Sequence, residues 1–334
     1  MNPRLTGLVI LIFLIWTLFY INVITKSSAG SRPSTPSPGG QHHWIEEESQ
    51  PSLAQRSQNN EEENNYRRFL RKQFDASEKS YQEYRRRRRE FVGADPAKVN
   101  PWPPARVMYF WDYFLPAFSC PYTIQRIGAL GDGGKWVCGM ELFDTVKTTD
   151  EKPEESFPNK DRPCIIYSFG VATESSFEAE FLERTDCEIW AYDASVDRMG
   201  NQVTTPHPRV HFNKVYIQPK GNATLGSLMK QNGHQWIDFL KMDIESGEFD
   251  VMEQILNEFQ ILPWGQLHIE IHGDEKGELF PKVYKMWESF EDKGLRPFKN
   301  EINHWPCVRA RLNPIYNEYS FINTKGPSRL LPNL

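Results

Sequence analysis

The chain has 334 residues, a formal net charge of −5 at pH 7 and 39% hydrophobic residues, including 10 Trp and 21 Phe. This mildly acidic balance gives no support to a nucleic-acid partner, and the apolar content is sufficient for a sizeable core. The roughly 230 residues that follow the first hundred suit a single domain.

Residues 5–25 read LTGLVILIFLIWTLFYINVIT and carry no charge. A helix of about 20 apolar residues spans a bilayer. We therefore expect a single transmembrane signal-anchor, preceded by a short cytosolic tail at residues 1–4. The alternative is a cleaved signal peptide, although the apolar region of such peptides usually has only about 7–15 residues.

Residues 26–100 form the predicted stem between this anchor and the globular domain. Residues 26–60 are rich in Ser, Pro, Gly, Gln and Asn, a composition that favours disorder. Residues 61–91 are highly charged and carry aromatic residues at loose helical spacing, which predicts a solvated helix. Arg85–Arg89 is then a solvated helix end or, alternatively, a processing site for a protease that cuts at dibasic sequences.

The predicted location is the Golgi or secretory lumen, with the protein held as a single-pass membrane protein. A short amino-terminal tail before a large carboxyl-terminal domain favours this orientation. The sequon Asn222–Thr224 is compatible with a glycosylated lumenal protein. Cleavage of the apolar segment or of Arg85–Arg89 would release a secreted form.

Residues 101–334 have the pattern of an α/β domain. Strand-like runs begin at Cys164, Cys187, Arg209, Asp238 and Gln266. Helical patterns cover residues 177–185, 224–231, 248–259 and 281–293. This alternation predicts a mostly parallel sheet with helices on both faces. Residues 318–323 (EYSFIN) have no helical pattern behind them and predict a final antiparallel strand.

Five cysteines are present without a C-x-x-C pair, which argues against a zinc site. Cys164 and Cys187 each stand at the start of a predicted strand. If these strands are parallel neighbours, both thiols begin at the same end of the sheet, within disulfide distance. The alternative is a pair of buried free thiols.

A cofactor site is indicated where the first of these strands ends. Gly170 follows the strand directly, and Ser175 with Glu178 fits a capping box at the start of a helix. The turn lacks G-x-G-x-x-G, so a dinucleotide is not the expected ligand. Asp193 ends the next strand, where an acid accepts hydrogen bonds from ribose hydroxyls; alternatively it caps a helix. Together these features favour S-adenosylmethionine.

Two buried-looking strands carry polar residues at every second position. Residues 239–245 read FLKMDIE, and residues 267–272 read LHIEIH. Side chains alternate between the faces of a strand, so the polar sets of neighbouring strands share one sheet face. Lys241 and Glu270 are then expected to neutralise each other in the middle of the sheet.

Asp243, Glu245 and His272 lie near the carboxyl ends of the same two strands. In parallel sheets this edge borders the ligand-binding crevice. Carboxylates with a histidine perform acid–base chemistry or hold a divalent metal, and these three residues are the candidate catalytic groups. The alternative is an ion-pair network without a catalytic role.

At these motifs the sequence resembles a known family. The runs SFGVATESSFE, AYDAS, DFLKMDIESGEFDVMEQI and QLHIEIH resemble the family called methyltransferase domain 22, and so does RIGALGDGGKWVCGM upstream. They are more distantly similar to FkbM-type methyltransferases, whose hallmark is D-x-L-K-x-D-x-E-G-x-E. Ser246 departs from this pattern. The resemblance covers roughly residues 105–324.

This resemblance implies a class I Rossmann-like methyltransferase fold that binds S-adenosylmethionine. It implies donor contacts at Phe169, Gly170 and Asp193, with Asp243 beside the methyl group. The glycine-rich segment 131–135 is either a simple hairpin turn or a loop over the donor. The acceptor is not implied.

Residues 301–304 (EINH) follow a strand-like run and either reach the same cleft or lie on a surface loop, which we favour. The predicted function is O-methylation of a glycan or another secretory-pathway acceptor, by analogy with FkbM-type relatives. One alternative is a Golgi glycosyltransferase whose metal is held by Asp243 and Glu245. The other is a non-catalytic lumenal scaffold that retains the fold.

Overall fold

The computed structural model describes residues 53–103, 108–145, 162–304 and 306–331. The predicted cytosolic tail, the anchor at residues 5–25 and the first part of the predicted stem lie outside these described residues. Among the helices of the described ranges, none combines the length and the apolar character needed to cross a bilayer.

The described residues form five α-helices and nine strands, and these match the predicted order of elements. The helices are α2 (Leu53–Val92), α3 (Ser176–Arg184), α4 (Leu225–Asn232), α5 (Glu248–Glu258) and α6 (Phe280–Asp292). The strands are β1 (Ile124–Ile127), β2 (Lys135–Cys138), β3 (Ile165–Phe169), β4 (Glu188–Tyr192), β5 (Val210–Asn213), β6 (Ile237–Met242), β7 (Trp264–His272), β8 (Leu295–Ile302) and β9 (Tyr316–Asn323).

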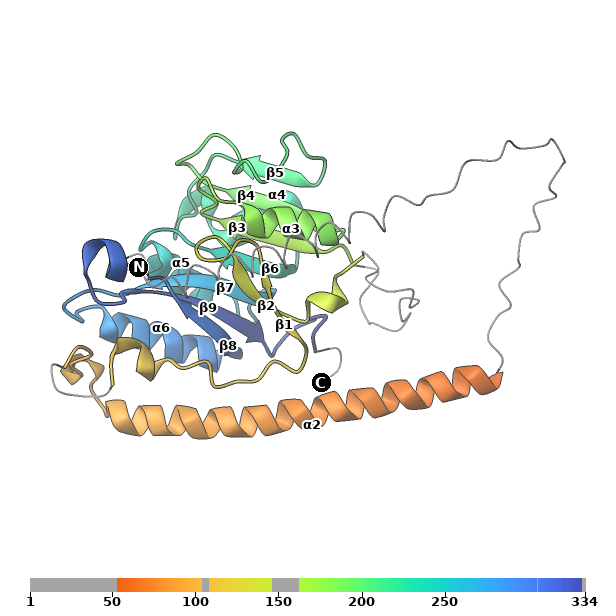
Figure 1. Ribbon diagram of the computed structural model, residues 1–334, viewed down its shortest axis with the longest axis horizontal. Helices are drawn as coiled ribbons and strands as arrows, with labels where there is room; N and C mark the ends of the chain where they lie inside the picture. Colours follow the sequence, from red (N-terminus) through yellow and green to blue (C-terminus); the bar gives the residue numbers. More distant parts are fainter. Residues whose placement is uncertain (1–52, 104–107, 146–161, 305, 332–334) are drawn as a thin grey trace, which may run out of the picture. The chain divides into compact units, whose positions relative to one another are not determined.

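Seven strands form one sheet in the order β5-β4-β3-β6-β7-β9-β8 (Figure 1). All neighbours from β5 to β7 are parallel, whereas β9 is antiparallel to both β7 and β8. The predicted mostly parallel sheet with a late antiparallel strand is therefore confirmed. The chain runs from β3 outward to β5 and then returns to β6 on the other side of β3. Ligands of such sheets bind beyond the carboxyl ends of the strands at this reversal.

The two faces of the sheet are packed against different elements. Helices α4, α5 and α6 pack on one face, where Tyr167, Leu240 and Leu267 belong to the larger apolar cluster. Helix α3 and the separate β1–β2 hairpin cover the other face, where Ile166 and Phe239 join the second cluster (Figure 1). Alternate residues of each strand supply the two clusters, as expected for strands that are buried on both sides.

Two disulfides are present among the described residues. Cys164–Cys187 joins the starts of the parallel strands β3 and β4, which is the first of the two alternatives that the sequence left open. Cys120–Cys138, which the sequence analysis did not propose, ties the end of β2 to the segment before β1. Both pairings depend on which strands become neighbours. Only the first pair had a sequence signal, because both of its cysteines begin strands at the same sheet end.

The carboxyl-terminal part of α2 is packed against α6, so the prediction of a wholly solvated helix is wrong. Arg88 is buried and donates a hydrogen bond of 2.9 Å to Glu291, which is fully buried and also accepts from Tyr81. Arg85 is likewise buried and bonds to Glu288 at 3.1 Å. These arginines are buried because α6 presents acids at matching positions, which the composition of α2 alone could not indicate.

We expect the Arg88→Ala variant to be less stable than the wild type by about 3 kcal/mol, since it removes one of the two arginines, Arg88 and Arg85, that pair with the buried Glu291 carboxylate. Arg87→Ala is the matched control, because Arg87 is 72% exposed and, among the residues that the structure describes, pairs only with Glu83 on its own helix. Its expected cost is below about 1 kcal/mol. Urea unfolding followed by circular dichroism measures both, and equal losses in the two variants would contradict the burial argument.

Candidate functional site

Gly170 lies where the carboxyl ends of β3 and β6 meet. Its φ is +75°, and a Cβ atom at this position would lie 1.6 Å from the carbonyl oxygen of Asp243. The Asp243 N–H donates to the carbonyl of Phe169 at 3.0 Å. Glycine is therefore required for the two strand ends to touch. The Phe169 ring is part of the core under the α4–α6 helices, so it does not face the site.

Asp193 ends β4 beside the same turn. Its carboxylate accepts from the N–H of Ala172 at 2.8 Å and from the N–H and hydroxyl of Ser195 at 2.7 and 2.6 Å. Burial raises the pKa of Asp193, but the bonds from Ser195 and Ala172 outweigh burial and hold it below its ordinary value. No helix follows Asp193 directly, so the helix-cap alternative is wrong. The N–H of Val171 also contributes to this lowering of the pKa, so the turn after β3 holds the Asp193 carboxylate through several donors.

The capping box predicted at the start of α3 is not formed. Ser175 precedes the helix, but its hydroxyl accepts from the N–H of Gly200 at 2.9 Å. Glu178 is fully buried and bonds instead to Ser168 and to the Nζ of Lys241. The buried ammonium competes successfully for this carboxylate, because an unpaired charge beneath the sheet is far more costly than an uncapped helix end.

The polar residues of β6 and β7 share one face, as predicted, but the predicted Lys241–Glu270 pair is wrong. Lys241 lies opposite His268 in the parallel register, and its Nζ is 3.2 Å from Glu178 of α3. The second buried lysine, Lys135 of β2, pairs with Glu318 of β9. Both lysines therefore find carboxylates on elements outside the β6–β7 pair.

Burial, together with these two lysines, determines the protonation state of His268. Burial lowers the pKa of His268 to about 3, and the neighbouring ammonium groups of Lys135 and Lys241 contribute to the shift. Its Nδ1 lies 3.1 Å from the Ser320 hydroxyl. His268 is therefore a neutral structural residue.

His272 lies among acids at the carboxyl edge. Its Nδ1 is 3.2 Å from Oε1 of Glu248, and its Nε2 is 3.5 Å from Glu270 and 3.7 Å from Glu245. Burial lowers the pKa of His272, but Glu248 and the other acids outweigh burial and raise it to about 9. Burial and the nearby Asp243 carboxylate raise the pKa of Glu270 to about 8. Sequence reasoning assigned Glu270 a structural role and did not single out Glu248.

The turn between β6 and α5 places these acids. Glu245 and Ser246 have φ of +53° and +71°, a left-handed conformation that is costly without glycine. Ser246 stands where the hallmark of the similar families has glycine, so this departure falls on a strained position. The Glu245 side chain is 89% exposed, whereas Glu248 is fully buried and accepts from the Ser246 N–H at 3.3 Å.

The segment 131–135 belongs to the hairpin that joins β1 and β2, which was one of the two alternatives left open, and it also reaches the acidic side of the candidate site. One carboxylate oxygen each from Asp132, Asp243 and Glu318 lies within 4.8 Å of the others. Glu301 accepts from Arg126 at 2.9 Å, and Arg126 holds the hairpin loop through the carbonyl of Gly131 at 2.5 Å. The loop therefore places Asp132 over the end of β6.

The residues after β8 differ in their access to the site. Asn303 donates to Glu270 at 3.0 Å, so the favoured surface-loop role is wrong for Asn303. His304 is exposed, in keeping with that role.

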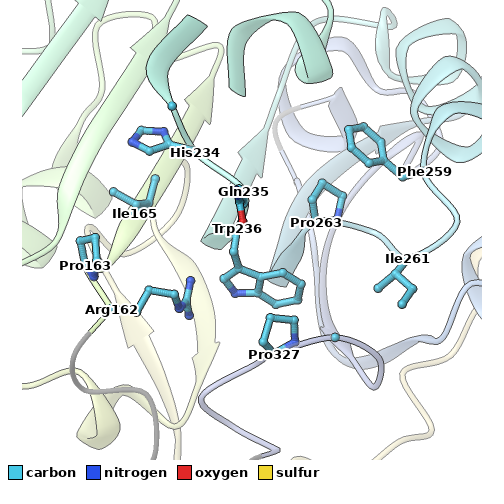
Figure 2. A pocket seen from close by; sticks show the side chains of 12 residues that line it. Arg162, Pro163, Ile165, His234, Gln235, Trp236, Phe259, Ile261, Pro263 and Pro327 are labelled. Atoms are coloured by element: carbon cyan, nitrogen blue, oxygen red, sulfur yellow. The ribbon is translucent and has the colours of Figure 1, made fainter. Parts of the chain in front are cut away.

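A separate hollow of about 610 Å³ lies at the opposite edge of the sheet (Figure 2). It is lined by Ile165 at the start of β3, Trp236 just before β6 and Pro263 just before β7, with Arg162 and His234 beside them. These are the amino ends of the parallel strands. The hollow is therefore distinct from the carboxyl edge that carries Gly170, Asp193 and Asp243.

The strand order, the single antiparallel strand within it and a ligand edge without a diphosphate-binding glycine motif define a class I Rossmann-like methyltransferase fold. A family model described as a methyltransferase domain, Methyltransf_22, matches residues 72–315. The chain belongs to this family, which confirms the resemblance seen in the sequence and implies the use of S-adenosylmethionine.

Several known proteins are similar to parts of the chain. "Probable methyltransferase-like protein 24" of Homo sapiens is 30% identical over 161 residues, which cover 42% of this chain and 43% of the relative. The protein of the same name from Rattus norvegicus is 30% identical over 158 residues, with 41% and 43% covered. The match thus spans less than half of either relative. Among solved structures, the Methanococcus jannaschii fibrillarin pre-rRNA processing protein is 13% identical over 61% of this chain and 99% of its own, with a TM-score of 0.34.

The Gly170→Ala variant tests the contact between β3 and β6. We expect it to lose several kcal/mol of stability and its affinity for S-adenosylmethionine, because the new methyl group overlaps the Asp243 carbonyl. Gly93→Ala is the control, since Gly93 has a φ of +76° but no atom within 4 Å of its added Cβ. Its expected cost is about 1 kcal/mol. Thermal unfolding measures the stability of both variants. Similar losses in the two would mean that the positive φ alone explains the cost at Gly170, without the overlap with Asp243.

Proposed function

We propose that this chain transfers the methyl group of S-adenosylmethionine to an acceptor hydroxyl, as in a glycan, within the secretory pathway. The observation that carries the proposal is the meeting of Gly170, Asp193 and Asp243 at one sheet edge. Asp193 lies at the tip of the second strand, where an acid accepts hydrogen bonds from ribose hydroxyls, and Ala172 and Thr173 of the turn after Gly170 are exposed. These features suit a nucleoside without a diphosphate. When bound, S-adenosylmethionine supplies an electrophilic methyl group on a sulfonium.

The acidic side of the same edge supports a hydroxyl acceptor. A hydroxyl must lose its proton as its oxygen is methylated, so a proton acceptor is needed nearby. Asp243, Glu270 and His272 lie together there, with Asp132 of the hairpin near Asp243. Asp243 is the proposed proton acceptor, because the raised pKa values of Glu270 and His272 keep both of these groups protonated near neutral pH. Aligning the acceptor oxygen with the methyl group would contribute the largest share of the rate.

Features far from the site support the secretory location. Disulfides such as Cys120–Cys138 and Cys164–Cys187 persist in oxidising compartments. Asn222 of the sequon is exposed, as a glycosylated side chain must be. With the predicted anchor at residues 5–25, these features fit a single-pass protein whose domain lies in the lumen.

Binding of S-adenosylmethionine and S-adenosylhomocysteine to the full-length protein in detergent, measured by calorimetry, tests the proposal. We expect a micromolar Kd, which corresponds to about −8 kcal/mol. Asp193→Ala should weaken binding roughly 10-fold or more, because it removes charged hydrogen bonds to the ribose. Asp197→Ala is the control, since its side chain is 86% exposed and pairs only with Lys214 among the described residues.

Two results would overturn the proposal. Binding of a UDP-sugar with MnCl₂, without binding of either adenosyl ligand, would favour the glycosyltransferase alternative. Absence of all binding by a folded protein would favour the scaffold alternative.

A further inference from the structure

Two buried side chains at the carboxyl edge hold polar atoms that lack a hydrogen-bond partner. Within the described part of the chain, neither ring nitrogen of His272 has such a partner, and neither does Oε2 of Glu248. The two side chains are 3% and 0% exposed, respectively. Leaving a buried polar atom unpartnered costs about 1–3 kcal/mol. The pair therefore has unsatisfied capacity for a ligand.

His272 and Glu248 lie close together, but they are not aligned as a hydrogen-bonded ion pair. The Nδ1 of His272 is 3.2 Å from Oε1 of Glu248, but the two atoms do not form a hydrogen bond, because the ring N–H does not point toward this oxygen. One donor atom each from Asp243, Glu248 and His272 lies within 4.8 Å of the others, which completes a set of three.

The surroundings hold these donors in place. Oε1 of Glu248 accepts from the N–H of Ile244 at 3.1 Å and of Ser246 at 3.3 Å, which fixes the carboxylate and leaves Oε2 free. The other side of the imidazole faces Glu270, with Nε2 3.5 Å from its Oε2. A carboxylate behind the ring is the usual neighbour of a metal-bound histidine.

We propose that Asp243, Glu248 and His272 form a binding site for one divalent cation, best matched by Mn²⁺. Two carboxylates suit hard cations and one imidazole suits transition metals, and Mn²⁺ accepts both kinds of ligand. The neighbouring group that shares Asp243 is less suitable, because its Glu318 is already paired with Lys135 and its Asp132 is exposed.

A cation at this position would bind an acceptor hydroxyl and favour loss of its proton, which the nearby carboxylates would receive. Only this use of the cation rests on the proposed methyl transfer. Binding of the cation itself follows from the residues of this chain and does not depend on that function.

Calorimetric titration of MnCl₂ into the full-length protein in detergent, after treatment with EDTA and its removal, tests the site. We expect one Mn²⁺ per chain, and at least 10-fold weaker binding in Glu248→Gln and in His272→Gln. Glu248→Gln retains the Oε1 acceptor that holds the turn. Glu253→Gln is the matched control, because it removes the same charge from a side chain of the same helix that is 58% exposed, and it should bind Mn²⁺ within about 2-fold of the wild type.

Absence of Mn²⁺ binding to the folded wild type would overturn the proposal. Equal affinity in all four proteins would also overturn it, since the ion would then bind elsewhere on the surface. Near-ultraviolet circular dichroism identifies an unfolded variant, in which case the other ligand variant decides.

A parallel titration with S-adenosylmethionine separates this proposal from the proposed function. Donor binding without Mn²⁺ binding leaves the methyltransferase proposal standing and removes the cation site. Mn²⁺ binding without donor binding leaves the cation site standing and removes the methyltransferase proposal.

Discussion

Charge buried beneath one face of the sheet is the constraint on which the rest of the structure depends. Lys241 and Lys135 are both 3% exposed, and their carboxylate partners Glu178 and Glu318 come from α3 and β9. Removing such charges from water costs several kcal/mol each unless a partner is supplied. These two ion pairs therefore favour the observed arrangement of helix α3 and the β1–β2 hairpin on this face.

That arrangement creates the two halves of the candidate site. The hairpin that delivers Lys135 also carries Asp132 over the end of β6, and α3 follows directly from the turn that begins at Gly170. Because Lys135 and Lys241 are both paired with carboxylates beneath the sheet, the acidic side chains at the strand ends outnumber the cations near them. The proposed nucleoside site beside β3 and β4, which includes Asp193, thus adjoins an acidic surface at β6 and β7, and this arrangement suits the proposed donor and hydroxyl acceptor.

Much of the fold could be predicted, because strand and helix periodicity are local properties of the chain. The order of elements, the antiparallel β9 and the Cys164–Cys187 disulfide all follow from which residues begin and end strand-like runs. Gly170, Asp193 and Asp243 could be placed together for the same reason, since the ends of parallel strands meet at one edge. The partners of the buried charges could not be predicted, because they depend on strand register and on elements that are distant in sequence.

By itself, the sequence determined the class of fold, the edge of the sheet that carries the site and the family to which the chain belongs. Only the tertiary structure decided that Glu178 pairs with Lys241 rather than caps α3, that α2 is docked by Arg88, and that Glu248 is buried against His272. Each of these outcomes is a competition among charged groups for a few buried partners. Which charged group obtains the partner depends on distances and on the cost of desolvation. Neither can be read from the spacing of residues along the chain.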